Sequence, residues 1–290
     1  MNVVAGNFFE HGITMRTPTV TPAIEGVSVN ASAGERIRDT GSYSARNSSK
    51  GALIEEAARI FSAVAAGASV GEVHDSVRRG GVLSQRSAHN RQRIWTLIQL
   101  RYLTPNTPWL TAALAENATR GVRGAEFVSL LYLLYALRDR LTFDFVTTVL
   151  WPKGHRGRPA VSRDDVLDLL KSVTPKQPHI DRWSESTRIK LAGSVLTALR
   201  DFGVLVGKQK KTLSHPPLPP STAEAVVRIL IAEGHRGREV VEHPVWRLFM
   251  LAPPDVAQVL AALAQRGKIR FEKVGTTVVL ETPAAWEGES

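Results

Sequence analysis

The sequence predicts a mainly α-helical protein with a helix-turn-helix-like N-terminal part and a C-terminal winged-helix domain. Three observations support this fold class. Apolar residues recur at spacings of three and four through most of the chain, as in amphipathic helices. Gly and Pro end these periodic segments at short intervals. Only near the C-terminus, over 268–281, does the apolar period change to two, which is typical of a strand–turn–strand.

The charge balance favours a polyanionic partner. The 290 residues include 37 Lys and Arg against 27 Asp and Glu, which gives a formal net charge of +10. Such a surface attracts DNA, RNA or an anionic membrane. An arginine-preferring genome explains the same composition, and that alternative stays open. The absence of cysteine excludes disulfide frameworks, cysteine–zinc sites and thiol nucleophiles.

Composition divides the chain into three parts. We expect a disordered leader over 1–41, an N-terminal helical domain over 42–178 and a C-terminal domain over 179–290. The longest apolar run, 127–137, is shorter than the roughly 20 residues that span a bilayer. No secretory signal is evident, so we expect a cytoplasmic protein without a membrane partner.

Helical signals follow one another through the N-terminal part. Apolar residues at Leu53, Ala57 and Ile60 predict a helix that Gly67 ends, and a short helix opened near Ser69 closes at 80–81. Further helices are predicted from about Ser84 or Ser87 to Tyr102, over 109–116, over 125–138 and over 143–150.

The middle of the chain combines a loop with two capped helices. Composition predicts a loop over 152–159. Ser162 then opens a helix, with Asp165 three residues on as an acidic capping box. A second capped helix begins near Trp183, ends in a glycine turn at Gly203 and leads into a lysine cluster.

The C-terminal part has the element order of a winged helix. A stiff proline-rich connector over 216–220 precedes three predicted helices, which are 222–232, 246–251 and 253–266. Two alternating strands then follow, joined around Gly275. We therefore predict a winged-helix domain over about 221–282. A small α+β cap of another kind is the alternative.

The predicted helix from 84–87 onward carries the first candidate DNA contacts, Arg86, His89 and Arg93. Such side chains hydrogen-bond phosphates and base edges, and a helix fits the major groove. The alternative is an ordinary solvated helix face.

The second candidate site is a cluster of cations around the lysine run. Lysines on a mobile loop clamp phosphates without strict geometry. The alternative is a loop that only aids solubility. The cluster consists of Arg188, Lys190, Lys208, Lys210 and Lys211.

The third candidate is the Arg-Gly-Arg-Pro sequence that contains Arg156 and Arg158. In extended form it fits a narrow, A·T-rich minor groove, whose negative potential attracts arginine. A plain basic loop is the alternative.

No catalytic or metal centre is predicted. The histidines are scattered, without the helical i, i+4 pattern of a zinc site. Neither a phosphate-cradling Gly-Lys-Ser/Thr loop nor a Gly-x-Ser-x-Gly elbow occurs. We expect no enzyme activity and no cofactor.

Several sequence pieces, taken in order and spacing, resemble the BrxA family of bacterial BREX phage-defence systems. The resemblance covers most of the chain after residue 42. The pieces are Ser44-Ala45-Arg46 with 51–56, 90–94, Arg138 with 143–146, Trp183 with 187–191, 199–203, and 246–249.

The resemblance implies a mostly helical protein of winged-helix character that binds double-stranded DNA without catalysis. It also implies an operon with a methyltransferase, an ATPase and a phosphatase-like component. We therefore predict a DNA-binding accessory protein with other BREX components as further partners. Two alternatives stay open. One is an assembly adaptor that docks an acidic protein, because the segment 254–266 has Arg266 as its only basic residue. The other is an RNA-binding helical protein.

Overall fold

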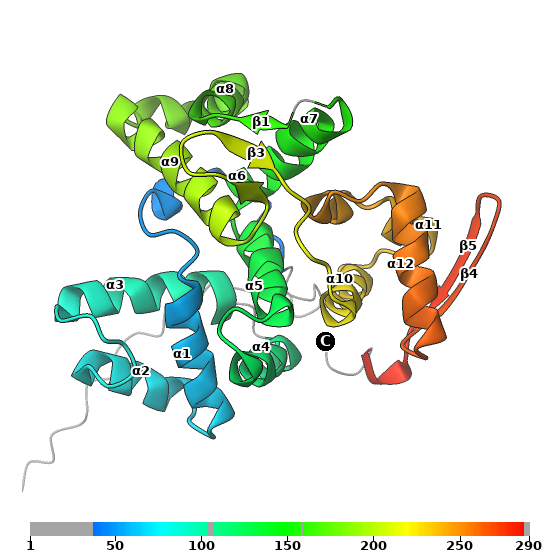
Figure 1. Cartoon of the computed structure of the whole chain (residues 1–290), viewed down its shortest axis with the longest axis horizontal. Helices are drawn as coiled ribbons and strands as arrows, with labels where there is room; N and C mark the ends of the chain where they lie inside the picture. Colours follow the sequence, from blue (N-terminus) through cyan, green and yellow to red (C-terminus); the bar gives the residue numbers. More distant parts are fainter. Residues whose placement is uncertain (1–36, 104–106, 158, 287–290) are drawn as a thin grey trace, which may run out of the picture. The chain divides into compact units, whose positions relative to one another are not determined.

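The computed structural model describes residues 37–103, 107–157 and 159–286. The described chain is mainly helical, as predicted, with two small antiparallel sheets (Figure 1). Residues 37–41, which the sequence assigned to a leader, lie against helices. Ile37 is buried, and the N–H of Asp39 donates to the carbonyl of Leu137 at 2.7 Å. The remainder of the predicted leader lies outside the described residues.

The N-terminal helices follow the predicted order. The hydroxyl of Ser69 accepts the N–H of Glu72, whose carboxylate accepts the N–H of Ser69, so a capping box begins α2. α1 packs on α4, and α2 packs on α3. The N-terminal elements are η1 (Ala45–Asn47), α1 (Ile54–Ala65), α2 (Val70–Arg79), α3 (Ala88–Ile98), the π-helical η2 (Gln99–Leu103) and α4 (Pro108–Arg120).

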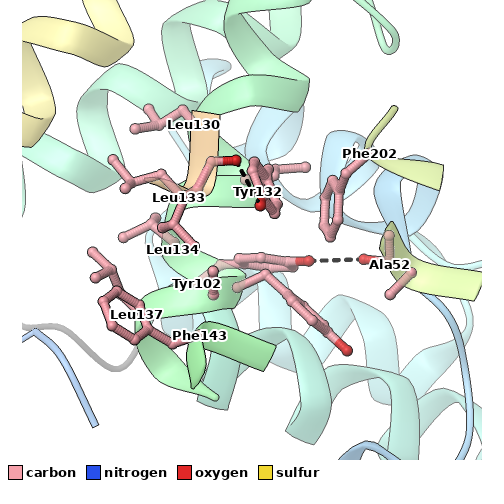
Figure 2. Packing of buried hydrophobic residues seen from close by; sticks show 14 of the residues in the cluster. Ala52, Tyr102, Leu130, Tyr132, Leu133, Leu134, Leu137, Phe143 and Phe202 are labelled. Atoms are coloured by element: carbon pink, nitrogen blue, oxygen red, sulfur yellow. Dashed lines mark hydrogen bonds between the residues drawn. The ribbon is translucent and has the colours of Figure 1, made fainter. Parts of the chain in front are cut away.

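The helix α5 (Ala125–Arg138) has the predicted bounds and lies at the centre of the core. It is apolar all round, so it is buried on nearly every side. Tyr132 packs against Phe202 and Phe249, which come from distant parts of the chain. The buried phenol of Tyr102 lies beside this cluster and donates to the carbonyl of Ala52 at 2.8 Å (Figure 2). α5 thus joins the N-terminal helices to the later elements.

A buried polar network holds the segment before α1 in place. Arg101 is 3% exposed, and its guanidinium donates to the side-chain oxygen of Asn47 and to the carbonyl of Gly51. Burial raises the pKa of the nearby Asp139 carboxyl, and hydrogen bonds from Thr142 act in the opposite direction. These bonds satisfy groups that would be costly to bury alone. They fix the η1 segment, which packs against α9 (Glu185–Asp201).

The loop predicted over 152–159 is wrong for its first half. α6 (Arg140–Asp144), the π-helical η3 (Phe145–Leu150) and α7 (Trp151–His155) follow one another directly. Pro152 lies in the first turn of α7, where a missing N–H is tolerated. The helical path therefore continues to His155.

The next elements form a small sheet that the sequence did not predict. The strands are antiparallel in the order β1-β3-β2. Ser162 begins α8 as expected, because its N–H donates to the carboxylate of Asp165 at 2.8 Å. The elements are β1 (Ala160–Val161), α8 (Arg163–Val173), η4 (Thr174–Lys176), η5 (Pro178–Arg182), α9, β2 (Leu205–Val206) and β3 (Lys211–Leu213).

The C-terminal elements have the predicted order of helices followed by a hairpin. The short helix expected at 246–251 is a 3-10 helix, and α11 before it was not predicted. The C-terminal elements are α10 (Pro220–Ala232), α11 (Arg238–Glu242), η6 (Pro244–Phe249), α12 (Pro253–Gln265), β4 (Arg270–Val274), β5 (Thr277–Glu281) and η7 (Ala284–Trp286).

A single cluster of buried apolar side chains extends from Ile37 to Ile269. Within the described ranges, no helix alone is long and apolar enough to cross a membrane. The segments 238–249 and 253–265 meet that criterion only as a pair bent by 101°.

Candidate nucleic-acid interface

The lysine cluster lies on a tight β-hairpin and not on the mobile loop that we predicted. β2 and β3 pair directly, with Val206 opposite Thr212. Gly207 opens the turn at a φ of +93°, and a Cβ there would lie 2.1 Å from the carbonyl oxygen of Lys210. Only glycine fits this position without a backbone shift. The hairpin therefore presents its lysines in a defined place.

The three lysines of this hairpin, Lys208, Lys210 and Lys211, differ in how they are held. Lys208 and Lys210 are exposed. The ammonium of Lys211 donates to the carbonyl of Lys208 at 2.8 Å, which closes the turn. Among the described residues, no carboxylate pairs with any of the three. Their positive charge is thus not neutralised locally.

The third strand brings the predicted Arg-Gly-Arg-Pro loop beside this hairpin. Val161 lies opposite Lys211 in the β1–β3 pair, and the N–H of Leu213 donates to the carbonyl of Pro159 at 2.8 Å. Arg156 is exposed at the end of α7, close to this edge in sequence. Arg158, the other predicted contact, lies outside the described residues.

Arg188 and Lys190 lie on α9 but do not share a face. Two positions along a helix differ by about 200° in direction. Arg188 is half-buried at one end of the apolar stripe that includes Ala192 and Val195, whereas Lys190 is exposed. Lys190 is one turn from Gly193 and two turns from Thr197, so it faces the same way as they do.

A cleft of about 890 Å³ lies between β1, β3, α8 and α9. Cations line it from separate elements, and two of them, Lys153 and Arg163, were not predicted as site residues. Lys153 is paired with Asp165 at 2.6 Å. The lining residues are Lys153, Ala160, Val161, Ser162, Arg163, Asp165, Gly193, Leu196, Thr197, Gln209, Lys210, Lys211 and Thr212.

The first predicted site is not entirely helical. Arg86 lies in the loop before Ser87, which caps α3, so its placement on the helix was wrong. His89 is exposed in the first turn. The guanidinium of Arg93 donates to the hydroxyl of Ser49 at 2.6 Å. The guanidinium of Arg91 donates to the carbonyls of Val77, Arg78, Gln85 and Arg86, and so fixes the connection between α2 and α3.

Three further arginines near this connection were missed. Arg78 and Arg79 are exposed in the last turn of α2, and Arg59 of α1 donates to the hydroxyl of Ser84 at 2.8 Å. Arg78 and Arg79 form an adjacent basic pair seven residues before Arg86, a local signal that was available, whereas Arg59 comes from a helix that approaches them only after folding. Arg86, His89 and Arg93 thus belong to a basic area on α1–α3, distinct in its elements from the hairpin cleft.

The C-terminal hairpin differs electrostatically. Arg270 is held between Glu272 at 3.0 Å and Glu281 at 3.2 Å. Lys268 pairs with Glu224 at 3.4 Å. Behind this hairpin, burial, together with Arg38 and His235, lowers the pKa of His243 to about 3. Arg270 and Lys268 are therefore neutralised locally, whereas Lys273 makes no ion pair among the described residues.

Among the described residues, no group of three or more His, Asp or Glu side chains is arranged to hold a metal ion. Fold and charge together define a mainly helical protein with an unneutralised basic hairpin beside a cleft.

The chain belongs to the BrxA family, whose model matches residues 41–229. It is therefore a BREX-associated defence protein. No curated protein matches the sequence. A solved structure of an uncharacterized protein from Magnetospirillum magneticum has the same fold, with 18% identity and a TM-score of 0.56 over 73% of this chain and 100% of that one. β1, α8, α9, β2 and β3 lie inside the matched residues, and α11 to β5 lie beyond them.

Proposed function

We propose that this BREX-associated protein binds double-stranded DNA, chiefly through phosphate contacts, and acts in the cytoplasm without catalysing a reaction. The observation that carries this proposal is the β2–β3 hairpin, with three lysines and no paired carboxylate. Lysine charges on such a hairpin attract a phosphate backbone and release its counterions.

The topology around the hairpin supports the proposal. A strand, two helices and a hairpin follow in the order β1, α8, α9, β2 and β3, and β1 pairs with the last strand. This order is similar to that of a winged helix, and in the proposal α9 is the recognition helix and the turn 207–210 the wing. We predicted a winged helix over about 221–282, and α10 to β5 keep that order too.

The connection between α2 and α3 supplies a second candidate contact. Its basic side chains surround two helices joined by a turn, as in a helix-turn-helix unit. If a duplex binds both the β2–β3 hairpin and this connection, the protein contacts its phosphates at two separate places.

Fluorescence anisotropy of a labelled duplex, titrated with the full chain at several salt concentrations, tests this function. We expect tight binding at low salt and a linear fall of log K with log salt. The slope of log K against log salt gives the number of phosphates that the protein neutralises. The proposal is ruled out if no binding occurs at low salt, or if the affinity does not change with salt concentration.

The C-terminal region favours a second candidate function, an assembly adaptor. α12 buries Val256, Leu260 and Leu263, and its neighbouring hairpin is neutralised by its own carboxylates. Such a surface suits a protein partner better than DNA. Co-purification with other BREX components after nuclease treatment separates a protein-mediated complex from one held by DNA. Competition between duplex DNA and RNA tests the RNA-binding alternative.

A further inference from the structure

The cleft beside the lysine hairpin has the size and lining of a small-molecule site. Its volume of about 890 Å³ lies in the range of ligand pockets. Three of its walls come from β1, β3 and the start of α8, and the fourth is the middle of α9.

Two cations of this cleft have no partner in the described part of the chain. Lys153 is neutralised by Asp165, and Lys211 donates to the hairpin carbonyl. Arg163 and Lys210 are exposed, and neither makes an ion pair or a side-chain hydrogen bond there. They approach the cleft from α8 and from the hairpin. Phosphate oxygens are the natural ligands of two such groups.

The interior of the cleft is less polar than its rim. Val161 and Leu196 are 6% and 4% exposed, and they line the cleft beside Gly193. A glycine in the middle of a helix lowers helix stability relative to alanine. A Cβ at Gly193 would meet nothing within 4 Å, so packing inside the protein does not require this glycine. Its place in α9 leaves room for a ligand to approach the backbone.

We propose that this cleft binds a nucleoside phosphate, with the phosphates on Arg163 and Lys210 and the nucleoside over Gly193 and Leu196. Ser162 and Thr197 line the same space, and the hydroxyl of Ser162 can hydrogen-bond the sugar or the base. The hydroxyl of Thr197 donates to the carbonyl of Gly193 at 2.8 Å, so toward a ligand it acts as an acceptor. A duplex cannot occupy the cleft in this way, since its bases stay stacked inside. The nucleotide site therefore shares Lys210 with the proposed DNA contacts and adds Arg163 and the space over Gly193 and Leu196.

Isothermal titration calorimetry of the full chain with ATP, GTP, CTP and UTP tests the proposal. At least one nucleotide should bind saturably with a stoichiometry near one. Pyrophosphate and the matching nucleoside should each bind at least about tenfold more weakly, because each makes only part of the contacts. If none of the four nucleotides binds, or if pyrophosphate binds equally well, the assignment is overturned.

Two sets of substitutions test whether the nucleotide binds in the cleft. Gly193→Leu fills the space, and Arg163→Ala with Lys210→Ala removes the free cations. Each change should lower the affinity for the nucleotide at least about tenfold. Lys171→Ala, an exposed lysine at the far end of α8, is the matched control and should leave affinity unchanged.

Titration of Gly193→Leu with nucleotide in the absence of duplex separates this proposal from the DNA-binding function. The variant should melt at or above the temperature of the parent, because leucine favours a helix. Gly193 lies on α9, the proposed recognition helix, so the duplex affinity of the variant does not decide the nucleotide site. Unchanged nucleotide affinity in this folded variant would overturn the site, whatever the duplex result.

Discussion

Two regions of this protein each place helices before a β-hairpin and differ in charge. β1, α8, α9, β2 and β3 end in a hairpin with three lysines and no acid. α10 to β5 also end in a hairpin, but that hairpin pairs Arg270 with two glutamates. Both hairpins turn at a glycine with positive φ.

Element order alone therefore does not identify a DNA-binding surface. Both regions place a hairpin beside a helix. The affinity of such a hairpin for a duplex depends on charges that the protein leaves without partners, because those release counterions from phosphates. On this criterion the first hairpin is the better candidate, although its strands are the shorter.

The largest expected effect comes from reversing the charges of the first hairpin. Combined Lys208→Glu, Lys210→Glu and Lys211→Glu should lower duplex affinity by about 100-fold or more at low salt and reduce the salt slope. The matched control reverses three cations at the other hairpin, Arg266, Lys268 and Lys273. Fluorescence anisotropy should show a much smaller loss there. Equal losses would remove the distinction between the hairpins.

The two turn glycines provide the next comparison. Gly207→Ala places a Cβ 2.1 Å from a carbonyl oxygen, whereas a Cβ at Gly275 meets nothing within 4 Å. Gly275→Ala should cost about 1 kcal/mol, the strain of a left-handed residue, and Gly207→Ala distinctly more. Urea unfolding measures both. Gly207→Ala should also weaken duplex binding about tenfold, because it displaces the lysines. If Gly207→Ala changes neither the free energy of unfolding nor the duplex affinity, the turn at Gly207 is not tight.

Removing carboxylates should make the second hairpin resemble the first. Glu272→Gln with Glu281→Gln leaves Arg270 without its two partners. Duplex affinity should rise by about threefold at low salt, and the gain should vanish at high salt. If affinity stays constant while the variant remains folded, the second hairpin lies away from the bound duplex.

A further expected effect is on stability rather than on binding and arises at His243, which lies beside Arg38 and His235. His243 is 8% exposed, and its pKa is lowered from 6.5 to about 3 by burial and by the neighbouring Arg38 and His235. Below pH 6.5 the imidazole of His243 therefore binds a proton in the unfolded chain, whereas in the folded chain it binds one only below about pH 3. Stability should fall as the pH drops through this window.

Calorimetry at pH 7 and pH 5 measures this loss, which should lower Tm by about 2 to 4 °C. His243→Gln should remove much of the pH dependence, whereas His215→Gln, at an exposed histidine, should keep it. An unchanged pH dependence in His243→Gln would contradict the assignment.

The helices were largely predictable from the sequence because their signals are local. The all-apolar segment Ala125–Arg138 defined α5 residue for residue, and the caps at Ser69 and Ser162 marked the starts of α2 and α8. Errors occurred where a signal was ambiguous, as at Pro152, which composition assigned to a loop and which lies inside a helix.

The sheet and the cleft were not predictable, because they depend on distant contacts. β1 and β2 have two residues each, too few to show an alternating pattern. β1 pairs with a strand about fifty residues later. Lys153 and Arg163 were therefore assigned to a loop and a helix start, and their place beside Lys210 became visible only in the fold.

Site-directed cross-linking tests most directly which hairpin contacts the duplex. The chain has no cysteine, so Lys208→Cys and Lys273→Cys each create a unique attachment point for a photoreactive group. We predict efficient cross-linking of a bound duplex from position 208 and little from position 273. Cross-linking that is equal at the two positions, or stronger from position 273, would contradict the account.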